Sequence, residues 1–331
     1  MTDDSSSGPM THLMTVSPTP VHRLPRLAEA LDMDPDCLWV KREDLTGLAG
    51  GGNKARKLQV LLADALAGGC DCLVTGGGAQ SNHARMTAAA ANIAGLDCEL
   101  LLTRLPDSFD PGGNVLLDRV LGATIHWVEG TVLPYAELES AIREHSEKLA
   151  LEGRRPYTLP IGGSSALGTR SYAEVARELD DLIDPDLVVV ATGSGGTHAG
   201  LVAGFGDHCR VLGVDVGARP ALATAVEDLA VAAAAMAGLS RPSGSCQLDT
   251  GQTGGGYGVP GEAAREALLT AARTDALLLD PVYTAKAMAG LFAARRSGRI
   301  GRTTRVVFMH TGGLPGLFTR RFTEWLAGES R

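Results

Sequence analysis

The chain is poor in aromatic residues and contains no long hydrophobic run. Only 4% of its 331 residues are Phe, Trp or Tyr, so the positions of the five tyrosines are informative. No apolar stretch approaches the roughly 20 residues that a membrane-spanning helix needs, and we expect no membrane partner. The formal net charge is -8 and no long basic run is present, so we expect no nucleic-acid partner either.

Neither the cysteine pattern nor the N-terminus indicates export or a metal site. The six cysteines are scattered, and Cys70 and Cys72 lie too close in sequence for a relaxed disulfide. No pair of C-x-x-C motifs occurs, so we expect reduced, buried thiols and no bound metal. Residues 1–9 are polar and acidic and lack the basic start and apolar core of a signal peptide. We expect residues 1–14 to be a disordered lead-in and the protein to be cytoplasmic.

Short apolar segments alternate with glycine turns and helical stretches along the chain. Strands are predicted at residues 38–44, 72–75, 98–102, 124–128, 154–161, 187–191, 211–216, 276–279 and 304–309. Helices are predicted at residues 81–94, 114–121, 133–152, 171–182, from about 198, and at 221–239, 262–274 and 284–297.

Continuous apolar strands between amphipathic helices are typical of parallel sheets that are covered on both faces. We therefore expect an α/β fold with two lobes, three layers and twisted, mostly parallel sheets. Residues 52–160 are expected to form a small domain and residues 15–51 with 161–331 a large one. In such folds ligands bind in the cleft at the carboxyl ends of the strands.

Glycines at positions 50–52 lead through Asn53 into Lys54, which opens an amphipathic run. A lysine placed by a glycine turn between a strand and a helix can form a Schiff base if its surroundings lower its pKa. A flexible loop with surface lysines is an equally good interpretation of this stretch alone.

Residues 192–197 (Thr-Gly-Ser-Gly-Gly-Thr) follow a predicted buried strand and open a helix. The backbone N–H groups of such a turn can converge on an anion, helped by the partial positive charge of the helix N-terminus. The turn completes neither G-x-x-x-x-G-K-[ST] nor G-x-G-x-x-G, since position 198 is His, which disfavours a nucleotide or dinucleotide site. A small phosphate cup fits, and a glycine turn without a ligand is the alternative.

A second triple glycine, at residues 76–78, precedes Gln80, Ser81, Asn82 and His83 at a predicted helix start. Ser81 or Asn82 could simply cap the helix. Four hydrogen-bonding side chains exceed what a cap needs, and a carboxylate at this helix N-terminus would be well held.

Further turns carry polar groups that a ligand could use. Tyr257 follows glycines at 254–256, Tyr283 precedes a predicted helix, and residues 310–313 (His-Thr-Gly-Gly) end the last predicted strand. Either tyrosine alone would be an ordinary exposed side chain. Pyridoxal phosphate accounts for all of these turns together, because it needs a lysine, an anion cup, a group near its ring nitrogen and a site for the substrate carboxylate.

The same stretches match a known family in order. Residues 41–47, 51–57, 80–85, 191–197, 280–284 and 310–313 resemble the fold-type II pyridoxal-phosphate family of D-cysteine desulfhydrase and 1-aminocyclopropane-1-carboxylate deaminase. The resemblance covers the chain from about residue 15 to its end. It implies a homodimeric enzyme that uses pyridoxal 5'-phosphate to act on a small amino acid.

The resemblance also implies roles for the matching residues. Lys54 would hold the cofactor as a Schiff base and then act as the base at Cα, and Asn82 would hydrogen-bond the ring hydroxyl. Thr311 would meet the ring nitrogen. The phosphate would be bound by Gly193, Ser194, Gly195, Gly196 and Thr197.

Substrate recognition would fall to the second glycine turn and the tyrosines. Ser81, with Gln80, Asn82 and His83 nearby, would take the substrate carboxylate. Tyr283 would stack beside the ring, with Tyr257 near the substrate. Lys54, Ser81, Tyr257 and Tyr283 are therefore the candidate catalytic residues.

Two threonines bear on which member of the family this is. In the deaminases an acidic residue after the second tyrosine meets the pyridine nitrogen, and Thr284 stands there in this chain. In the desulfhydrases the threonine of the His-Thr-Gly-Gly motif does so, and here it is Thr311. A neutral hydroxyl stabilises a protonated ring less than a carboxylate does. The ring is then a weaker electron sink, which suffices for β-elimination because the leaving group itself accepts electrons.

The resemblance therefore favours a β-eliminating lyase, with D-cysteine converted to pyruvate, ammonia and hydrogen sulfide. L-cysteate sulfo-lyase, another β-substituted amino acid lyase and 1-aminocyclopropane-1-carboxylate deaminase stay open. A non-catalytic small-molecule-binding protein and a dinucleotide-dependent oxidoreductase are weaker alternatives.

Several positions depart from the family pattern and leave the substrate open. His198 stands where glutamine is expected, residues 253–256 replace a Gly-Pro-Gly type of turn, and Gly261 replaces a threonine. Arg56 and Lys57 have no assigned role, and we expect both on a solvated helix face.

Overall fold

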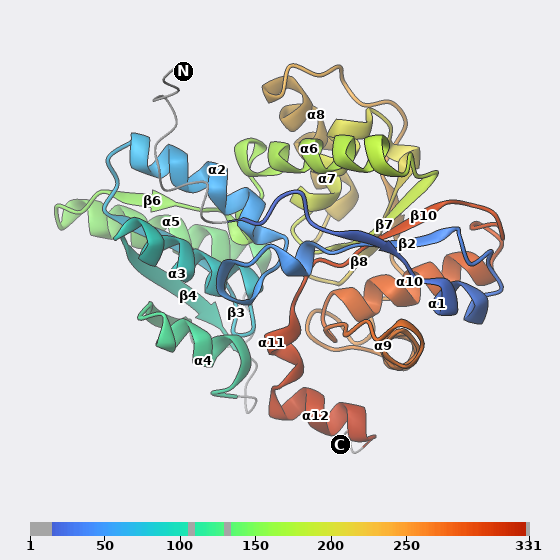
Figure 1. Cartoon of the computed structure of the whole chain (residues 1–331). Coiled ribbons are helices and arrows are strands. Elements are labelled where there is room, and N and C mark those ends of the chain that lie inside the picture. The colour runs from blue at the N-terminus through green and yellow to red at the C-terminus, as the bar shows by residue number, and fades with distance from the viewer. Residues whose placement is uncertain (1–14, 105–109, 129–133, 329–331) are drawn as a thin grey trace, which may run out of the picture.

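The computed structural model describes residues 15–104, 110–128 and 134–328, so the lead-in expected at residues 1–14 lies outside the described residues. Its strands form two sheets (Figure 1). The larger sheet has six strands, in the order β1 (Val21–Arg23), β2 (Leu38–Lys41), β10 (Val306–Met309), β7 (Leu187–Thr192), β8 (Val211–Asp215) and β9 (Gln247–Asp249). The smaller has four, in the order β5 (Thr124–Val128), β4 (Asp97–Thr103), β3 (Cys72–Gly78) and β6 (Pro156–Thr158).

Every neighbouring pair of strands is parallel except β1 and β2. The carboxyl ends of β2, β10, β7 and β8 therefore share one edge of the large sheet, and those of β5, β4 and β3 share one edge of the small sheet. Polar turns that follow these strands are brought together by the strand direction alone.

Helices cover both faces of the large sheet (Figure 1). One face packs on α1 (Pro25–Ala30), α9 (Glu262–Asp275) and α10 (Thr284–Arg296), and the other on α6 (Ala166–Leu182), α7 (Gly196–Phe205) and α8 (Leu222–Met236). Side chains of a strand point alternately to the two faces. Val189 and Phe308 belong to the first core and Val188 and Val307 to the second, which explains why these strands are apolar throughout.

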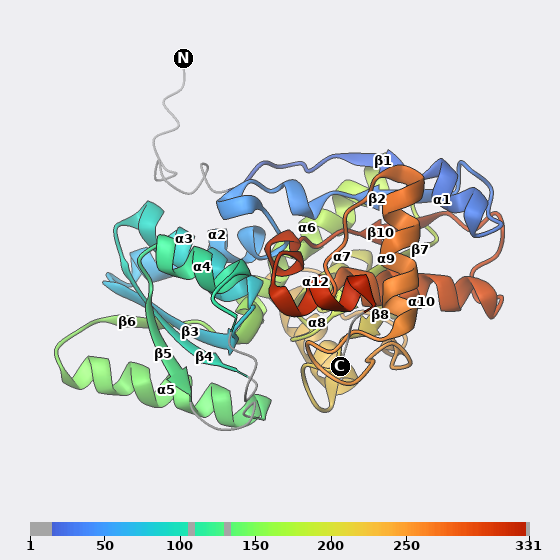
Figure 2. The same ribbon diagram turned by 90° about the horizontal axis from the view of Figure 1, so that it is seen from below.

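The small sheet is covered in the same way. α2 (Lys54–Ala67) and α3 (Asn82–Ala94) cover one face, while α5 (Tyr135–Leu151) runs along the other (Figure 2). α4 (Gly113–Val120) packs outside α3, and the short helices α11 (Leu314–Leu317) and α12 (Arg320–Ala327) end the chain.

The expected α/β class with mostly parallel sheets is confirmed, with differences in single elements. Residues 276–279 are not a strand: Leu277 and Leu279 are buried in the core, whereas Leu278 is 53% exposed, and no strand pairs with them. Their alternation reflects the packing of Leu277 and Leu279 into the core of the large sheet without strand pairing. The elements β1, β9, α1, α11 and α12 were not predicted, because four of them have six residues or fewer and little periodicity.

The cysteine prediction is only partly correct. All six cysteines are free thiols, as expected, but only Cys72 and Cys98 are buried and Cys209 is exposed. No helix among the described residues is long and apolar enough to cross a membrane.

Candidate active site

A cavity lies between the carboxyl edges of the two sheets. It collects residues from turns that are far apart in the sequence: the start of α2, the β3–α3 turn, the β7–α7 turn, and the segments around Tyr257, Tyr283 and Thr311. The predicted site residues that line it are Lys54, Ser81, Asn82, His83, Gly193, Ser194, Gly195, Gly196, Thr197, Tyr257, Tyr283 and Thr311. The separately predicted turns therefore belong to one site.

Lys54 is the first residue of α2 and its amine faces the cavity. The glycines before it are held firmly: the Thr46 hydroxyl donates to the Gly52 carbonyl at 2.8 Å, and the Gly52 N–H donates back to the Thr46 hydroxyl at 2.9 Å. A Cβ on Gly51 would lie 1.8 Å from the Asp44 carbonyl oxygen, and its φ of 76° is a glycine conformation. The interpretation of this stretch as a flexible loop is therefore wrong.

The surroundings of Lys54 suit covalent chemistry. Burial of the amine lowers the pKa of Lys54 to about 8, since the charged form loses hydration. A larger share of the amine is then neutral and nucleophilic near neutral pH.

The β7–α7 turn forms an anion-binding cup. Gly195, with φ of 95°, precedes Gly196, the first residue of α7, whose first-turn N–H groups have no partners within the helix. A Cβ on Gly196 would come within 2.6 Å of Lys57 Nζ and 2.5 Å of Ser164 Oγ, so any side chain there would have to displace these two polar groups. Asn53 Nδ2 donates to Thr197 Oγ1 at 2.8 Å and joins this cup to the start of α2.

Lys57 and Arg56 do not lie on a solvated helix face, and that prediction is wrong. Lys57 is fully buried, with Nζ donating to the Gly162 carbonyl at 3.2 Å and to Ser164 Oγ at 3.3 Å. Burial, and then the charge of Lys54, lowers the pKa of Lys57 well below its usual value. An anion bound in the cup would supply the counter-charge that this amine lacks. The sequence could have indicated that Lys57 is buried near the site, because it lies three residues after Lys54 and residues three apart share a helix face.

Of the residues predicted at the β3–α3 turn, some line the cavity and one points away from it. Ser81 caps α3, with its Oγ accepting from the Ala84 N–H at 3.2 Å, and it also lines the cavity. Asn82 lines the cavity too, and its Oδ1 accepts from Asn114 Nδ2 at 2.9 Å. Gln80 instead accepts from the Asn114 N–H at 2.8 Å and donates to the Gly112 carbonyl at 3.1 Å, which directs it towards α4 and away from the cavity.

His83 is buried and uncharged. Thr75 donates its hydroxyl to the Leu159 carbonyl, so His83 Nε2 carries the proton and donates to Thr75 Oγ1 at 3.1 Å. The other ring nitrogen, Nδ1, is buried and has no hydrogen-bond partner among the described residues. Burial and the nearby lysines Lys54 and Lys57 lower the pKa of His83 well below its usual value.

Tyr257 and Tyr283 meet through their hydroxyl groups, with their rings in an edge-on arrangement and centroids 6.0 Å apart. Burial raises the pKa of both phenols. The turn that carries Tyr283 is held by Asp280, which accepts from the Val282 N–H at 2.9 Å and the Tyr283 N–H at 3.0 Å.

The two threonines that bear on family membership have different surroundings. The Thr284 hydroxyl donates to Asp280 Oδ1 at 2.7 Å, and Thr284 does not contribute to the cavity lining. Thr311 lines the cavity, and its carbonyl accepts from the Asn53 N–H at 3.0 Å.

Some lining residues were not predicted from the sequence. Thr103 ends β4, Tyr135 starts α5, and Gly162 lies opposite the Ser194 side chain. Thr103 could have been predicted as a lining residue, because it is the last residue of a parallel strand. His198 also lines the cavity, and burial lowers its pKa to about 3, so it is neutral there.

Comparisons with known proteins agree with this arrangement. A family model described as pyridoxal-phosphate dependent enzyme matches residues 13–312. A D-cysteine desulfhydrase from Salmonella schwarzengrund is 38% identical over 316 residues, which cover 91% of this chain and 93% of the relative. The enzyme of the same name from Salmonella typhimurium is 38% identical over 315 residues, with the same two shares.

Solved structures show the same fold. A crystal structure described as an ACC deaminase homologue aligns with a TM-score of 0.86 and 34% identity, covering 96% of this chain and 95% of that one. Threonine deaminase isoform 2 from Solanum lycopersicum aligns with a TM-score of 0.61 at 17% identity, over 92% of this chain and 85% of that one, and shows the fold alone.

The chain therefore belongs to the family of pyridoxal-phosphate dependent enzymes. It is an enzyme of fold type II, and pyridoxal phosphate is its cofactor. The cavity fits this group: it offers an amine with a lowered pKa, a glycine cup at a helix N-terminus and a buried lysine, Lys57, that pairs with no carboxylate among the described residues.

Proposed function

We propose that the protein is a D-cysteine desulfhydrase, which converts D-cysteine and water to pyruvate, ammonia and hydrogen sulfide. The observation that carries the proposal is the pair of threonines: Thr311 lines the cavity, whereas Thr284 is hydrogen-bonded to Asp280. The ring nitrogen would then meet a neutral hydroxyl, as β-elimination allows. The identity to curated D-cysteine desulfhydrases over most of the chain supports the same substrate.

Pyridoxal phosphate, when bound, withdraws electrons from the substrate Cα and makes its proton acidic. Lys54 would hold the cofactor and remove this proton, because its amine lies at the cavity and has a pKa of about 8. The cup of Gly193, Ser194, Gly195, Gly196 and Thr197 would hold the phosphate, with Lys57 as its counter-charge.

The start of α3 would bind the substrate carboxylate. Ser81 lies there with Asn82 and His83, and the helix N-terminus attracts negative charge. Asn82 would also hydrogen-bond the ring hydroxyl. Gln80 is left out of this role because its amide is already bonded to Gly112 and Asn114.

The tyrosine pair would act at the leaving group. Burial raises the pKa of Tyr257 and Tyr283, so both phenols stay protonated at neutral pH. Tyr283 would lie beside the ring, and the linked hydroxyl of Tyr257 would donate a proton to the departing sulfide.

The test is to incubate the purified holoenzyme with D-cysteine, L-cysteine, L-cysteate and 1-aminocyclopropane-1-carboxylate in separate reactions. We expect pyruvate and sulfide in equal amounts from D-cysteine. No product from either enantiomer of cysteine would overturn the proposal. Pyruvate with sulfite from L-cysteate would point to a sulfo-lyase, and a 2-oxo acid from the cyclopropane to a deaminase.

We also propose that the protein is a homodimer in the cytoplasm. Each subunit would consist of a small domain at residues 52–160 and a large domain at residues 15–51 and 161–331. Helices and strands of the small sheet fall within the first range, which supports this division. Sedimentation analysis of the holoenzyme tests the dimer, and limited proteolysis tests the domain boundaries.

A further inference from the structure

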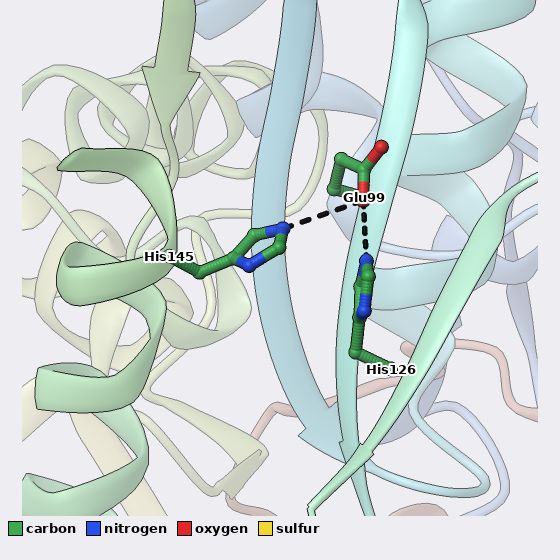
Figure 3. Close-up of side chains that lie close together, drawn as sticks. All are labelled: Glu99, His126 and His145. Carbon is green, nitrogen blue, oxygen red and sulfur yellow. Dashed lines mark hydrogen bonds and ion pairs between the residues drawn. The ribbon is translucent and has the colours of Figure 1, made fainter. Parts of the chain in front are cut away.

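Three side chains that play no part in the cofactor cavity converge on the small sheet (Figure 3). Glu99 comes from β4, His126 from the neighbouring strand β5, and His145 from α5, which packs on that face. Glu99 Oε2 lies 2.5 Å from His126 Nε2 and 3.3 Å from His145 Nε2. One nitrogen or oxygen atom from each residue lies within 4.8 Å of the other two.

This cluster lies between α5 and the sheet, beside an apolar core that includes Val74, Leu101 and Ile142. The same interface also holds a polar contact, in which the Thr158 hydroxyl donates to Ser146 Oγ at 2.7 Å. The side chains of Glu99 and His145 are only 12% and 16% exposed, whereas that of His126 is 41% exposed. Burying polar groups between a helix and a sheet is costly unless they find partners. The three side chains are partners of one another, and together they present two imidazole nitrogens and a carboxylate oxygen at one place.

We propose that Glu99, His126 and His145 form a binding site for a divalent transition metal ion, with Zn²⁺ the best match. Two imidazole nitrogens and one carboxylate oxygen are a ligand set that Zn²⁺ accepts, with water in the fourth position. Ca²⁺ and Mg²⁺ prefer oxygen ligands only.

The two distances from Glu99 to the imidazole nitrogens suit such an ion after a small adjustment. Zinc–nitrogen bonds of about 2.0–2.1 Å in a tetrahedron place the ligand atoms roughly 3.3 Å apart. The His145 contact is already 3.3 Å, and the His126 contact of 2.5 Å needs to open by less than about 1 Å. His126 lies on β5, the edge strand of the sheet, so the partly exposed imidazole leaves a route for the ion and its water.

The bound ion would join α5 to the sheet beside the cavity wall. α5 also carries Leu138, and β4 ends at Thr103, both of which line the cavity. His145 lies seven residues, or about 10 Å of helix, beyond Leu138. The ion is therefore expected to stabilise the small sheet and α5 without taking part in the reaction.

The test uses the full-length holoenzyme, freed of metals with a chelator and titrated with Zn²⁺ by calorimetry. We expect one equivalent to bind and the melting temperature to rise. His126→Ala and His145→Ala should each weaken Zn²⁺ binding by at least about tenfold. His22→Ala, which removes an exposed histidine of β1, is the matched control and should bind like the wild type.

Co²⁺ distinguishes this site from adventitious binding to a thiol such as the exposed Cys209. The expected visible spectrum is that of nitrogen and oxygen ligands, without a thiolate charge-transfer band. No Zn²⁺ binding at micromolar concentration, a thiolate spectrum, or unchanged affinity in both histidine variants would overturn the proposal. The visible absorbance of the bound cofactor reports folding of each variant, and His126→Gln, at the more exposed position, carries the test if His145→Ala does not fold.

Discussion

Three basic side chains at the start of α2 lie within four residues and have different surroundings. Lys54 faces the cavity, Arg56 is paired with Glu43 at 2.9 Å, and Lys57 is buried beside Gly196 of the β7–α7 turn. Helix geometry explains the division, because residues three apart share a face and residues two apart do not. Each side chain therefore has a separate function despite the similar chemistry.

The lowered pKa of Lys54 predicts how the apoenzyme takes up its cofactor. The rate at which the absorbance of lysine-bound pyridoxal phosphate appears should rise with pH and level off above a midpoint of about 8, because only the neutral amine reacts. Lys54→Ala should show no such absorbance, and Lys148→Ala, which removes an exposed lysine, should behave like the wild type. A midpoint at the ordinary lysine value of about 10.4 would contradict this.

The proposed contact of Thr311 with the ring nitrogen gives a second prediction for a single residue. Thr311→Val would remove the proposed hydrogen bond to the ring nitrogen, and kcat with D-cysteine should fall about fivefold, since a bond of about 1 kcal/mol corresponds to a factor of this size. Thr303→Val, at an exposed position before β10, is the control. An unchanged kcat in Thr311→Val would remove Thr311 from the ring-nitrogen role.

Among the elements, α3 has two tasks. Its first turn presents Ser81 and Asn82 to the cavity, and one turn further Arg85 Nη2 donates to the Gly51 carbonyl at 2.8 Å. Arg85 is fully buried, and Asp118 of α4 is the carboxylate that acts on it electrostatically. The glycine turn before Lys54 is thus held by a helix whose first turn also lines the cavity.

The burial of Asp118 beside Arg85 leads to a prediction about how stability depends on pH. Burial raises its pKa to about 7, although Arg85 opposes the shift, and both carboxylate oxygens lack hydrogen-bond partners among the described residues. The folded protein therefore holds the proton of the Asp118 carboxyl group more tightly than the unfolded chain does. The stability that this proton contributes is fully present below about pH 4 and is lost as the pH rises to 7.

Asp118→Asn keeps the neutral form at every pH. The variant should match the wild type near pH 4 and be more stable by about 2 kcal/mol at pH 8, within the roughly 4 kcal/mol that a shift of about three pKa units allows. Urea unfolding at several pH values measures the difference. A constant difference between the two proteins across this range would contradict the raised pKa.

For the whole molecule, α2 ties the small sheet to the large one. It covers the small sheet, yet Arg56 pairs with Glu43, which follows β2, and with Glu178 of α6 at 2.9 Å. Lys41 of β2 also reaches Glu178, at 2.6 Å. These largely buried ion pairs join α2, which carries Lys54, to the large sheet, which carries the anion-binding cup.

Removal of Arg56 should therefore destabilise the protein. Arg56→Met takes the cation away from the buried Glu43, and the free energy of unfolding should fall by about 3–5 kcal/mol. Arg296→Met breaks an exposed pair with Glu266 and should cost less than about 1 kcal/mol. A similar effect of the two variants in urea unfolding would show that the buried network does not hold the sheets together.

The sequence by itself determined the α/β class, most strands and helices, and the turns that make the site. Apolar strands buried on both faces and glycines at strand ends are local signals, so Lys54, the turn at 192–197 and Thr311 could be found without coordinates. Only the tertiary structure decided where side chains point. It turned Gln80 to α4, buried Lys57 and Arg56, and gathered Glu99, His126 and His145 from three elements. Such contacts depend on partners far along the chain, which no local pattern specifies.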